Sequence, residues 1–405
     1  MSRSRLPQSL LASVSTALLG AGTLAPAAAA DNAISTASAV ADKGAKPMMP
    51  SYPATRRLDL VETQFGVPVA DPYRWLEADV RSDKDVQAWV EAENATTKHY
   101  LQTLPGRDIL RARMAQLYDY ERYGTPRKAG TRYFYTRNSG LQNQSPLYVR
   151  DGLTGDQRLL LDPNSFAEDG ATALAEWLPS EDGRYLLYSV QDGGTDWRIL
   201  RVVDVDSGKT LDDRIEWVIY SDLSWSHDGS GFYYSRFAPR ADGSKFQSIV
   251  ENQQIWFHKI GTPQSADRRI YATPDRPKLG HTAEVTDDGR WLLITSSQGT
   301  DERYELTLIS LEKAKARPVR LVKGLDYEWQ LIGNVGDTLY FRTNAGAPRG
   351  RLVTLEARRP SLPPKEIVAK RQQTLVGASM IGSRIVLAYL SDARTVAELV
   401  DLKGV

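Results

Sequence analysis

Hydrophobic and polar residues alternate in short runs along most of this chain, and one turn-and-strand pattern returns at a nearly constant spacing. The clearest copy is Ser180–Trp197 (SEDGRYLLYSVQDGGTDW), which reads as a tight Asp-Gly turn, an apolar strand and a second glycine-rich turn. Similar turns precede an apolar strand at six glycines: Gly130, Gly183, Gly229, Gly289, Gly336 and Gly382. Their successive separations are 53, 46, 60, 47 and 46 residues.

A period of this length has room for about four short strands, which is typical of β-propeller blades. Each copy ends in an alternating strand, such as Ile199–Asp204 or Leu306–Ser310, that would pair antiparallel with the apolar strand before it. A single four-stranded sheet cannot bury both faces, so each blade must stack on the next. The spacing predicts an all-β propeller with six countable blades in residues 119–405. A β-sandwich is the alternative, but it usually needs fewer than the roughly two dozen strands implied here.

Before the repeats the hydrophobic pattern is helical. From Asp83 to Thr103 the apolar residues fall on or near one face, and Leu104–Gly106 (LPG) ends the pattern. Residues 108–118 then carry four apolar residues at helical spacing: Ile109, Leu110, Met114 and Leu117. The pattern predicts a short N-terminal helical segment over residues 56–118.

The first thirty residues read as a secretory signal peptide. Two arginines lie in residues 1–5, residues 10–25 are mostly apolar and small, and Ala27–Ala30 supplies a small-residue cleavage site. A membrane anchor is the weaker alternative, because the apolar run is short and broken by serine, glycine and proline. We therefore expect a secreted or periplasmic protein with no membrane span after signal cleavage. Residues 31–55, rich in Ala, Ser, Pro and Lys, are predicted to be a disordered leader.

Composition excludes several classes of function. Of the 405 residues, 51 are Lys or Arg and 50 are Asp or Glu, so there is no basic excess for a phosphate backbone and we expect no nucleic-acid partner. The absence of cysteine excludes disulfides, cysteine nucleophiles and thiolate metal sites.

Motifs for catalysis and cofactor binding are also missing. The best approach to the Gly-x-Ser-x-Gly elbow of serine hydrolases is Gly377–Ile381 (GASMI), which lacks the closing glycine and makes Ser379 a poor candidate nucleophile. The four histidines do not have the short spacing of zinc-binding helices and are interpreted as surface or structural residues: His99, His227, His258 and His281. Asp287–Gly289 (DDG) lacks the further spaced carboxylates of a calcium loop. We predict no catalytic residue, no metal site and no cofactor.

Several longer strings resemble the prolyl oligopeptidases, from about residue 50 to the last residue and in order. They are Asp71–Glu77 (DPYRWLE), Gly140–Gln144 (GLQNQ), Asp192–Arg198 (DGGTDWR), Gly231–Arg236 (GFYYSR) and His258–Asp267 (HKIGTPQSAD). The resemblance implies a serine endopeptidase that cuts after proline in short peptides, with an α/β-hydrolase catalytic domain capped by a seven-bladed propeller.

The chain departs from this family pattern at its end. In the family the nucleophile, the acid and the histidine follow the propeller, whereas this chain stops at Val405 without them. We therefore expect an incomplete propeller of six blades out of seven, no C-terminal α/β-hydrolase domain, and no activity of the chain alone. An N-terminal fragment, a truncated gene product and one half of a split enzyme remain open, the last with a separate hydrolase-domain polypeptide as partner.

The resemblance also assigns two substrate-binding residues. Tyr220 matches an aromatic that helps to wall the pocket for a substrate residue upstream of the proline, and Ile270 matches a second wall position. Packing in the core is the alternative role for both. By the same resemblance, the helical segment of residues 71–118 lies against the hydrolase domain, so its apolar face is expected to lack its cover here.

Three functions remain open at this point. The first is the propeller part of a secreted prolyl oligopeptidase-like peptidase, which gates the access of short proline-containing peptides to the catalytic domain. The second is a catalytically inactive peptide- or protein-binding propeller. The third is an independent carbohydrate-binding or lyase propeller.

Overall fold

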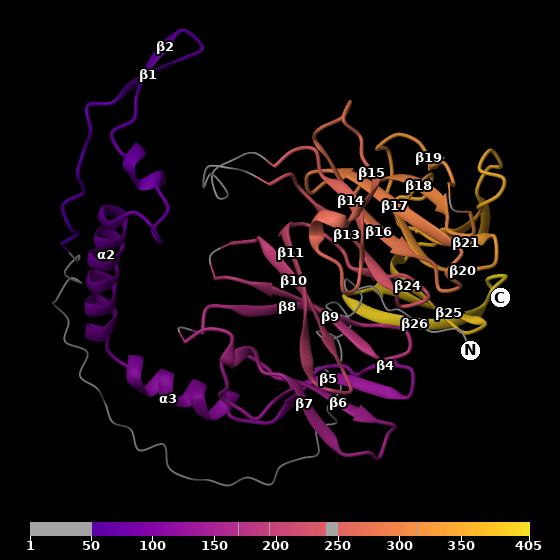
Figure 1. The fold of residues 1–405 in the computed structure, drawn as a ribbon, viewed down its shortest axis with the longest axis horizontal. Helices are drawn as coiled ribbons and strands as arrows, with labels where there is room; N and C mark the ends of the chain where they lie inside the picture. The colour runs from indigo at the N-terminus through magenta and orange to yellow at the C-terminus, as the bar shows by residue number, and fades with distance from the viewer. Residues whose placement is uncertain (1–50, 169, 194, 240–249, 314) are drawn as a thin grey trace.

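The computed structural model describes residues 51–168, 170–193, 195–239, 250–313 and 315–405. These residues form a helical segment and a fan of antiparallel sheets, with the helices set to one side of the sheets (Figure 1). The predicted signal peptide and most of the predicted leader lie outside the described residues.

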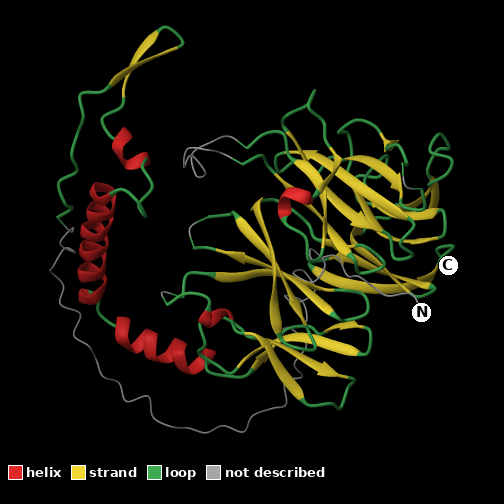
Figure 2. Cartoon of the chain, viewed as in Figure 1, coloured by secondary structure: helices red, strands yellow, loops and turns green. Residues whose placement is uncertain are grey.

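The helical segment begins with a small hairpin, β1 (Val61–Gln64) and β2 (Val67–Ala70), followed by a short 3-10 turn, η2 (Arg74–Glu77). Helix α2 (Lys84–Thr103) starts where the sequence pattern predicts, because the Asp83 carboxylate accepts hydrogen bonds from the first free backbone N–H groups of the helix. Gly106, with a φ of 78°, makes the turn into α3 (Arg107–Tyr118). Figure 2 shows both helices apart from the strands.

Six antiparallel sheets follow, one for each predicted repeat, and they form a β-propeller (Figures 1 and 2). The first sheet contains β3 (Arg122–Tyr123), β4 (Arg127–Ala129), β5 (Arg132–Asn138), β6 (Leu147–Asp151) and β7 (Gln157–Leu161). The second contains β8 (Ala173–Pro179), β9 (Tyr185–Gln191), β10 (Arg198–Asp204) and β11 (Lys209–Val218). The third contains β12 (Ser224–Trp225), β13 (Gly231–Arg236), β14 (Gln254–Lys259) and β15 (Arg268–Tyr271).

The last three sheets repeat the same strand order. The fourth contains β16 (Leu279–Val285), β17 (Trp291–Gln298), β18 (Glu305–Ser310) and β19 (Val319–Val322). The fifth contains β20 (Trp329–Val335), β21 (Thr338–Thr343), β22 (Arg351–Glu356) and β23 (Lys365–Val368). The sixth has three strands: β24 (Thr374–Ile381), β25 (Arg384–Ser391) and β26 (Arg394–Asp401). Two short 3-10 turns, η3 (Pro163–Ser165) and η5 (Gln264–Ala266), lie in connecting loops. In the part of the chain that is described, the fold is the predicted propeller with a helical segment before it.

The repeated turn is stabilised in the same way in three blades. In each, an aspartate carboxylate accepts a hydrogen bond from a hydroxyl two residues earlier, at 2.6 Å, 2.6 Å and 2.8 Å: Ser180 to Asp182, Ser226 to Asp228, and Thr286 to Asp288. The following glycine adopts a positive φ that other residues rarely tolerate, 74° at Gly183. The recurring string therefore encodes the corner that joins the first strand of a blade to its second.

The core lies between successive blades. Five clusters of buried apolar residues join the described sheets in pairs, from the first and second blades to the fifth and sixth. Phe134 of β5 packs in one cluster with Leu186 of β9, and Leu352 of β22 packs in another with Leu387 of β25. Each such side chain contributes about 1.5–3 kcal/mol by leaving water. Stacking of the blades therefore supplies the burial that a single sheet lacks.

Candidate functional site

A large cavity lies where the first strands of several blades converge. Its volume is about 960 Å³, and its wall includes residues from β16, β20 and β24 together with loops of the third to sixth blades. The first strands of three different sheets line one space, so they are the innermost strands of their blades. We call this cavity, on the side of the third to sixth blades, the channel.

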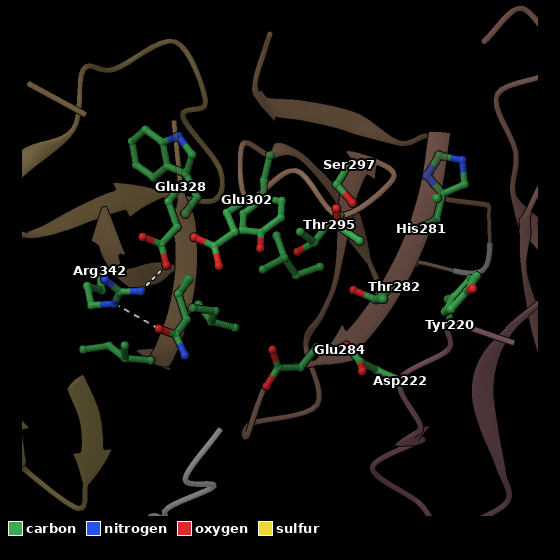
Figure 3. A pocket seen from close by; sticks show the side chains of 18 of the residues that line it. Tyr220, Asp222, His281, Thr282, Glu284, Thr295, Ser297, Glu302, Glu328 and Arg342 are labelled. Atoms are coloured by element: carbon green, nitrogen blue, oxygen red, sulfur yellow. Dashed lines mark hydrogen bonds and ion pairs between the residues drawn. The ribbon is translucent and has the colours of Figure 1, made fainter. Parts of the chain in front are cut away.

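Charged side chains of both signs line this channel (Figure 3). The carboxylates are those of Asp222, Glu284, Asp287, Glu302 and Glu328, and the cations are those of Lys278, Arg342 and Arg349. The Arg342 guanidinium is ion-paired with the Glu328 carboxylate and donates a second hydrogen bond, of 3.0 Å, to the side-chain oxygen of Gln330. The wall thus offers peptide-like ligands polar groups as well as apolar strand surface.

The carboxyl groups of Glu176 and Asp222, the latter just before β12, interact electrostatically. Glu176 on β8 is 13% exposed and forms an ion pair of 3.2 Å with Arg198. Burial, and then the negative charge of Asp222, raise the pKa of Glu176 to about 7. Burial likewise raises the pKa of Asp222, although a hydrogen bond with Thr282 opposes the shift. Asp222 is exposed to solvent in the channel. We therefore expect burial to raise its pKa only modestly.

Tyr220 lies at the wall of the channel with its side chain 62% exposed (Figure 3). Its backbone is left-handed, with a φ of 53°, and Trp217 three residues earlier has a φ of 64°. For a residue with a side chain, this conformation costs about 1–2 kcal/mol. Strain of this kind persists only where the surroundings impose it, and it is concentrated at functional sites. The exposed aromatic ring is thus held in place by its backbone.

Two hydrogen bonds hold the backbone at Tyr220, and two further contacts hold Trp217. The side-chain amide of Gln253 donates hydrogen bonds to the carbonyl oxygens of Ile219 and Tyr220, at 2.9 Å and 3.0 Å. The Phe237 N–H donates to the Trp217 carbonyl oxygen at 3.1 Å. In addition, Trp217 packs in an aromatic cluster with Trp197, their ring centres 5.7 Å apart.

Ile270, the second residue assigned by resemblance, lines a different and smaller cavity. This space of about 270 Å³ also contacts Gln253, Arg269 and Tyr271. Ile270 is half-buried on β15 and packs against the core cluster between the third and fourth blades. The structure therefore does not bring Tyr220 and Ile270 into one cavity, but Gln253 lines both cavities. A substrate-binding role for the two residues stays a prediction.

Sequence reasoning missed several residues of the site. Gln253 lies in the polar string Glu251–Gln254 (ENQQ) immediately before β14, and this string was the only local signal of its role. The ion pair of Arg342 on β21 with Glu328, which immediately precedes β20, depends on the register of this hairpin, which the sequence pattern does not specify. The contacts of Gln253 with Ile219, Tyr220 and His281 become visible only when the blades are assembled.

Ser379, the weak candidate nucleophile of the sequence analysis, lies in the interior of the protein. Ser379 is buried on β24. Within the described ranges, no group of three or more His, Cys, Asp or Glu side chains is arranged to hold a metal ion. No helix in that part of the chain is long and apolar enough to cross a membrane.

Comparison with known proteins places this architecture in a family. The family model described as "Prolyl oligopeptidase, N-terminal beta-propeller domain" matches residues 52–404. The chain is 34% identical over 354 residues to a prolyl endopeptidase of Elizabethkingia meningoseptica, covering 87% of this chain and 49% of that protein. It is 28% identical to prolyl oligopeptidase A of Amanita bisporigera, covering 86% and 50%. The chain thus spans about half the length of these curated relatives.

Solved structures show the same relationship. A structure from a mechanistic study of two prolyl endopeptidases matches with a TM-score of 0.66 and 42% identity, over 88% of this chain and 51% of that one. Prolyl oligopeptidase B from Galerina marginata, bound to a 35-residue hydrolysis and macrocyclisation substrate, shares the fold with a TM-score of 0.76 and 24% identity, over 88% and 53%. The chain belongs to the prolyl oligopeptidase family, and residues 52–404 match its N-terminal β-propeller domain.

Proposed function

We propose that this chain is the substrate-gating propeller of a secreted serine endopeptidase of the prolyl oligopeptidase type. In this proposal it admits short proline-containing peptides to a catalytic α/β-hydrolase domain, which is not among the described residues. Secretion rests on the signal-peptide pattern of residues 1–30 and points to the extracellular space or the periplasm.

The channel is the observation that carries this proposal. Its volume of about 960 Å³ matches the upper range of small-ligand pockets, about 300–1,000 Å³. An extended peptide advances by about 3.3 Å per residue and is narrow, so a few residues fit where a folded domain does not. A channel of this size supports selection by size.

Tyr220 supports the binding of a peptide residue upstream of the proline. Its ring is exposed at the channel wall, and an aromatic ring combines a large apolar face with a polar hydroxyl. An exposed tyrosine on a fixed backbone suits contact with the side chain of that upstream residue.

The helical segment supports a catalytic domain as the partner. Four apolar side chains of α3 are strongly exposed: Ile109, Leu110, Met114 and Leu117. An amphipathic helix normally buries such a stripe, and large exposed apolar patches mark interaction sites. We infer that the α/β-hydrolase domain of the family covers this face, whether on the same polypeptide or on a separate one.

The second candidate is a catalytically inactive peptide- or protein-binding propeller. It is favoured by the same channel, because binding there requires no catalytic group. The family assignment leaves the third possibility, an independent carbohydrate-binding or lyase propeller, without support.

Fluorescence anisotropy with a labelled Gly-Pro-containing peptide of five residues tests the proposal. We expect the full chain to bind it, and Tyr220→Ala to weaken binding by about tenfold, or about 1.4 kcal/mol. Tyr52→Ala is the matched control, since Tyr52 is 66% exposed and lies outside the sheets. The same peptide displayed on a folded carrier protein should not compete. Equal competition by the carrier-bound peptide would contradict gating by size.

A further inference from the structure

Gln253 connects three segments of the channel wall through one side chain. It precedes β14 and is 2% exposed. Its amide nitrogen donates both protons, to the carbonyl oxygens of Ile219 at 2.9 Å and Tyr220 at 3.0 Å. Its amide oxygen accepts the backbone N–H of His281 at 2.6 Å. The amide therefore has little freedom to rotate.

These bonds act on the part of the chain that is strained. Two successive carbonyl groups, on either side of the Tyr220 N–Cα bond, point at the same amide nitrogen. This orientation needs the left-handed backbone of Tyr220, whose φ is 53°. Without the amide, the backbone would relax toward the ordinary region and carry the aromatic ring with it.

The amide oxygen of Gln253 is bound to strand β16 through His281. His281 belongs to β16, is 1% exposed, and its carbonyl oxygen accepts the Ser235 hydroxyl at 2.5 Å. Its imidazole contacts the hydroxyls of Ser296 and Thr273 at 2.8 Å and 3.0 Å. Burial, and then the nearby Arg276, lower the pKa of His281 to about 4, so the ring is neutral at pH 7.

We propose that Gln253 is a positioning residue, which fixes Tyr220 at the channel wall for a proline-containing peptide without contributing the main contact itself. This inference rests on the proposed role of Tyr220. It also assigns Gln253 a place between the two cavities, because the same side chain lines the cavity of Tyr220 and that of Ile270.

The side-chain amide of Gln144 provides a matched control. Gln144 donates from its side-chain nitrogen to the Thr172 carbonyl oxygen at 2.7 Å and accepts the Leu174 N–H at 3.3 Å. It therefore links two blades by the same chemistry, but it does not line the channel cavity. Gln253→Glu and Gln144→Glu each replace the amide with a carboxylate of the same shape, which repels the carbonyl oxygens and loses the donors.

The absence of cysteine in this chain allows a direct measurement at position 220. A spin label attached to the full-chain variant Tyr220→Cys reports local motion by electron paramagnetic resonance. We expect Gln253→Glu to shorten the rotational correlation time of the label at least about twofold, and Gln144→Glu to leave it unchanged. Gln253→Met removes the hydrogen bonds without adding a charge and serves if the Glu variant does not fold.

A second measurement separates this inference from the proposed function. With Tyr220 present, Gln253→Glu should weaken binding of the five-residue Gly-Pro peptide about tenfold, while Gln144→Glu should not. If the unaltered chain binds no peptide, the proposed function fails, and the spin label still decides whether Gln253 positions residue 220. An unchanged label in both Gln253→Glu and Gln253→Met would overturn the inference.

Discussion

His258 and Asp213 form a contact that is closed to solvent, with the imidazole Nε2 2.8 Å from the carboxylate Oδ1. The other ring nitrogen, Nδ1, lies 2.6 Å from Oδ1 of Asp267, whose second oxygen accepts the Tyr234 hydroxyl at 2.5 Å. Strands β11, β13 and β14 and the turn before β15 are thus joined at one imidazole. Burial alone would lower the pKa of His258, but the two carboxylates outweigh it and raise the pKa to about 9.

This shift predicts how stability depends on pH. His258 binds its proton more tightly in the folded chain than in the unfolded chain, where its pKa is about 6.5. The stabilisation is therefore fully present below about pH 6.5 and is lost as the pH rises through about 9. Urea unfolding of the full chain from pH 6 to pH 10 should show this decrease. In His258→Gln, the part of the decrease between pH 7 and pH 9 should be absent.

Removal of the imidazole should be costly at neutral pH. His258→Ala leaves two buried carboxylates without their cation, and loss of one partner of a buried ion pair costs about 3–5 kcal/mol. His227→Ala is the control, because His227 pairs with Glu181 at a side chain that is 53% exposed, where we expect a change within about 0.5 kcal/mol. Equal losses for the two variants in urea unfolding would contradict the structural role of His258.

Glu176 predicts a loss of stability with rising pH as well, over a more acidic range than His258. Burial and the charge of Asp222 raise its pKa to about 7 from the ordinary 4.5, so the folded chain keeps this proton after the unfolded chain has lost it. Between these pH values the group makes folding less favourable as the pH rises. Relative to the unaltered chain, Glu176→Gln should therefore gain on the order of 1–3 kcal/mol between pH 5 and pH 8. Glu366→Gln, at an exposed ion pair, should show no such gain.

The architecture could be predicted because its signal is local and repeated. The turn of residues 180–183 needs a residue that tolerates a positive φ at Gly183 and a hydroxyl that donates to Asp182. Both requirements are met by residues next to each other in the sequence. A similar residue pattern recurs in later blades, so its spacing alone indicates the number of sheets. Helix α2 was predictable for the same reason, since its cap and its apolar face lie within one segment.

The site could not be predicted in this way because its contacts join distant segments. Gln253 meets Tyr220 across 33 residues and His281 across 28. The left-handed backbone of Tyr220 is not indicated by its residue type, because glycine and asparagine are the usual residues in that region. His258 was interpreted as surface or structural, and only the assembled sheet shows that two carboxylates enclose it.

The chain by itself should show no serine peptidase activity. Its best approach to a nucleophile elbow contains Ser379, which is buried on β24 and not displayed on a turn. Incubation of the full chain with a fluorophosphonate probe should give no stoichiometric label, and a chromogenic Gly-Pro substrate should be hydrolysed only at background rate. A related full-length prolyl endopeptidase serves as the positive control. Stoichiometric labelling of any serine would refute this prediction.

We propose that the channel between the inner strands receives short proline-containing peptides. A Gly-Pro peptide that carries a photoreactive benzophenone tests it most directly, with the crosslinked residues identified by mass spectrometry. We expect adducts at the channel wall, at Tyr220 and along β16 near Thr282 and Glu284, which an excess of unlabelled peptide suppresses. Adducts confined to α3 or to the outer strands, with none at the channel wall, would contradict it.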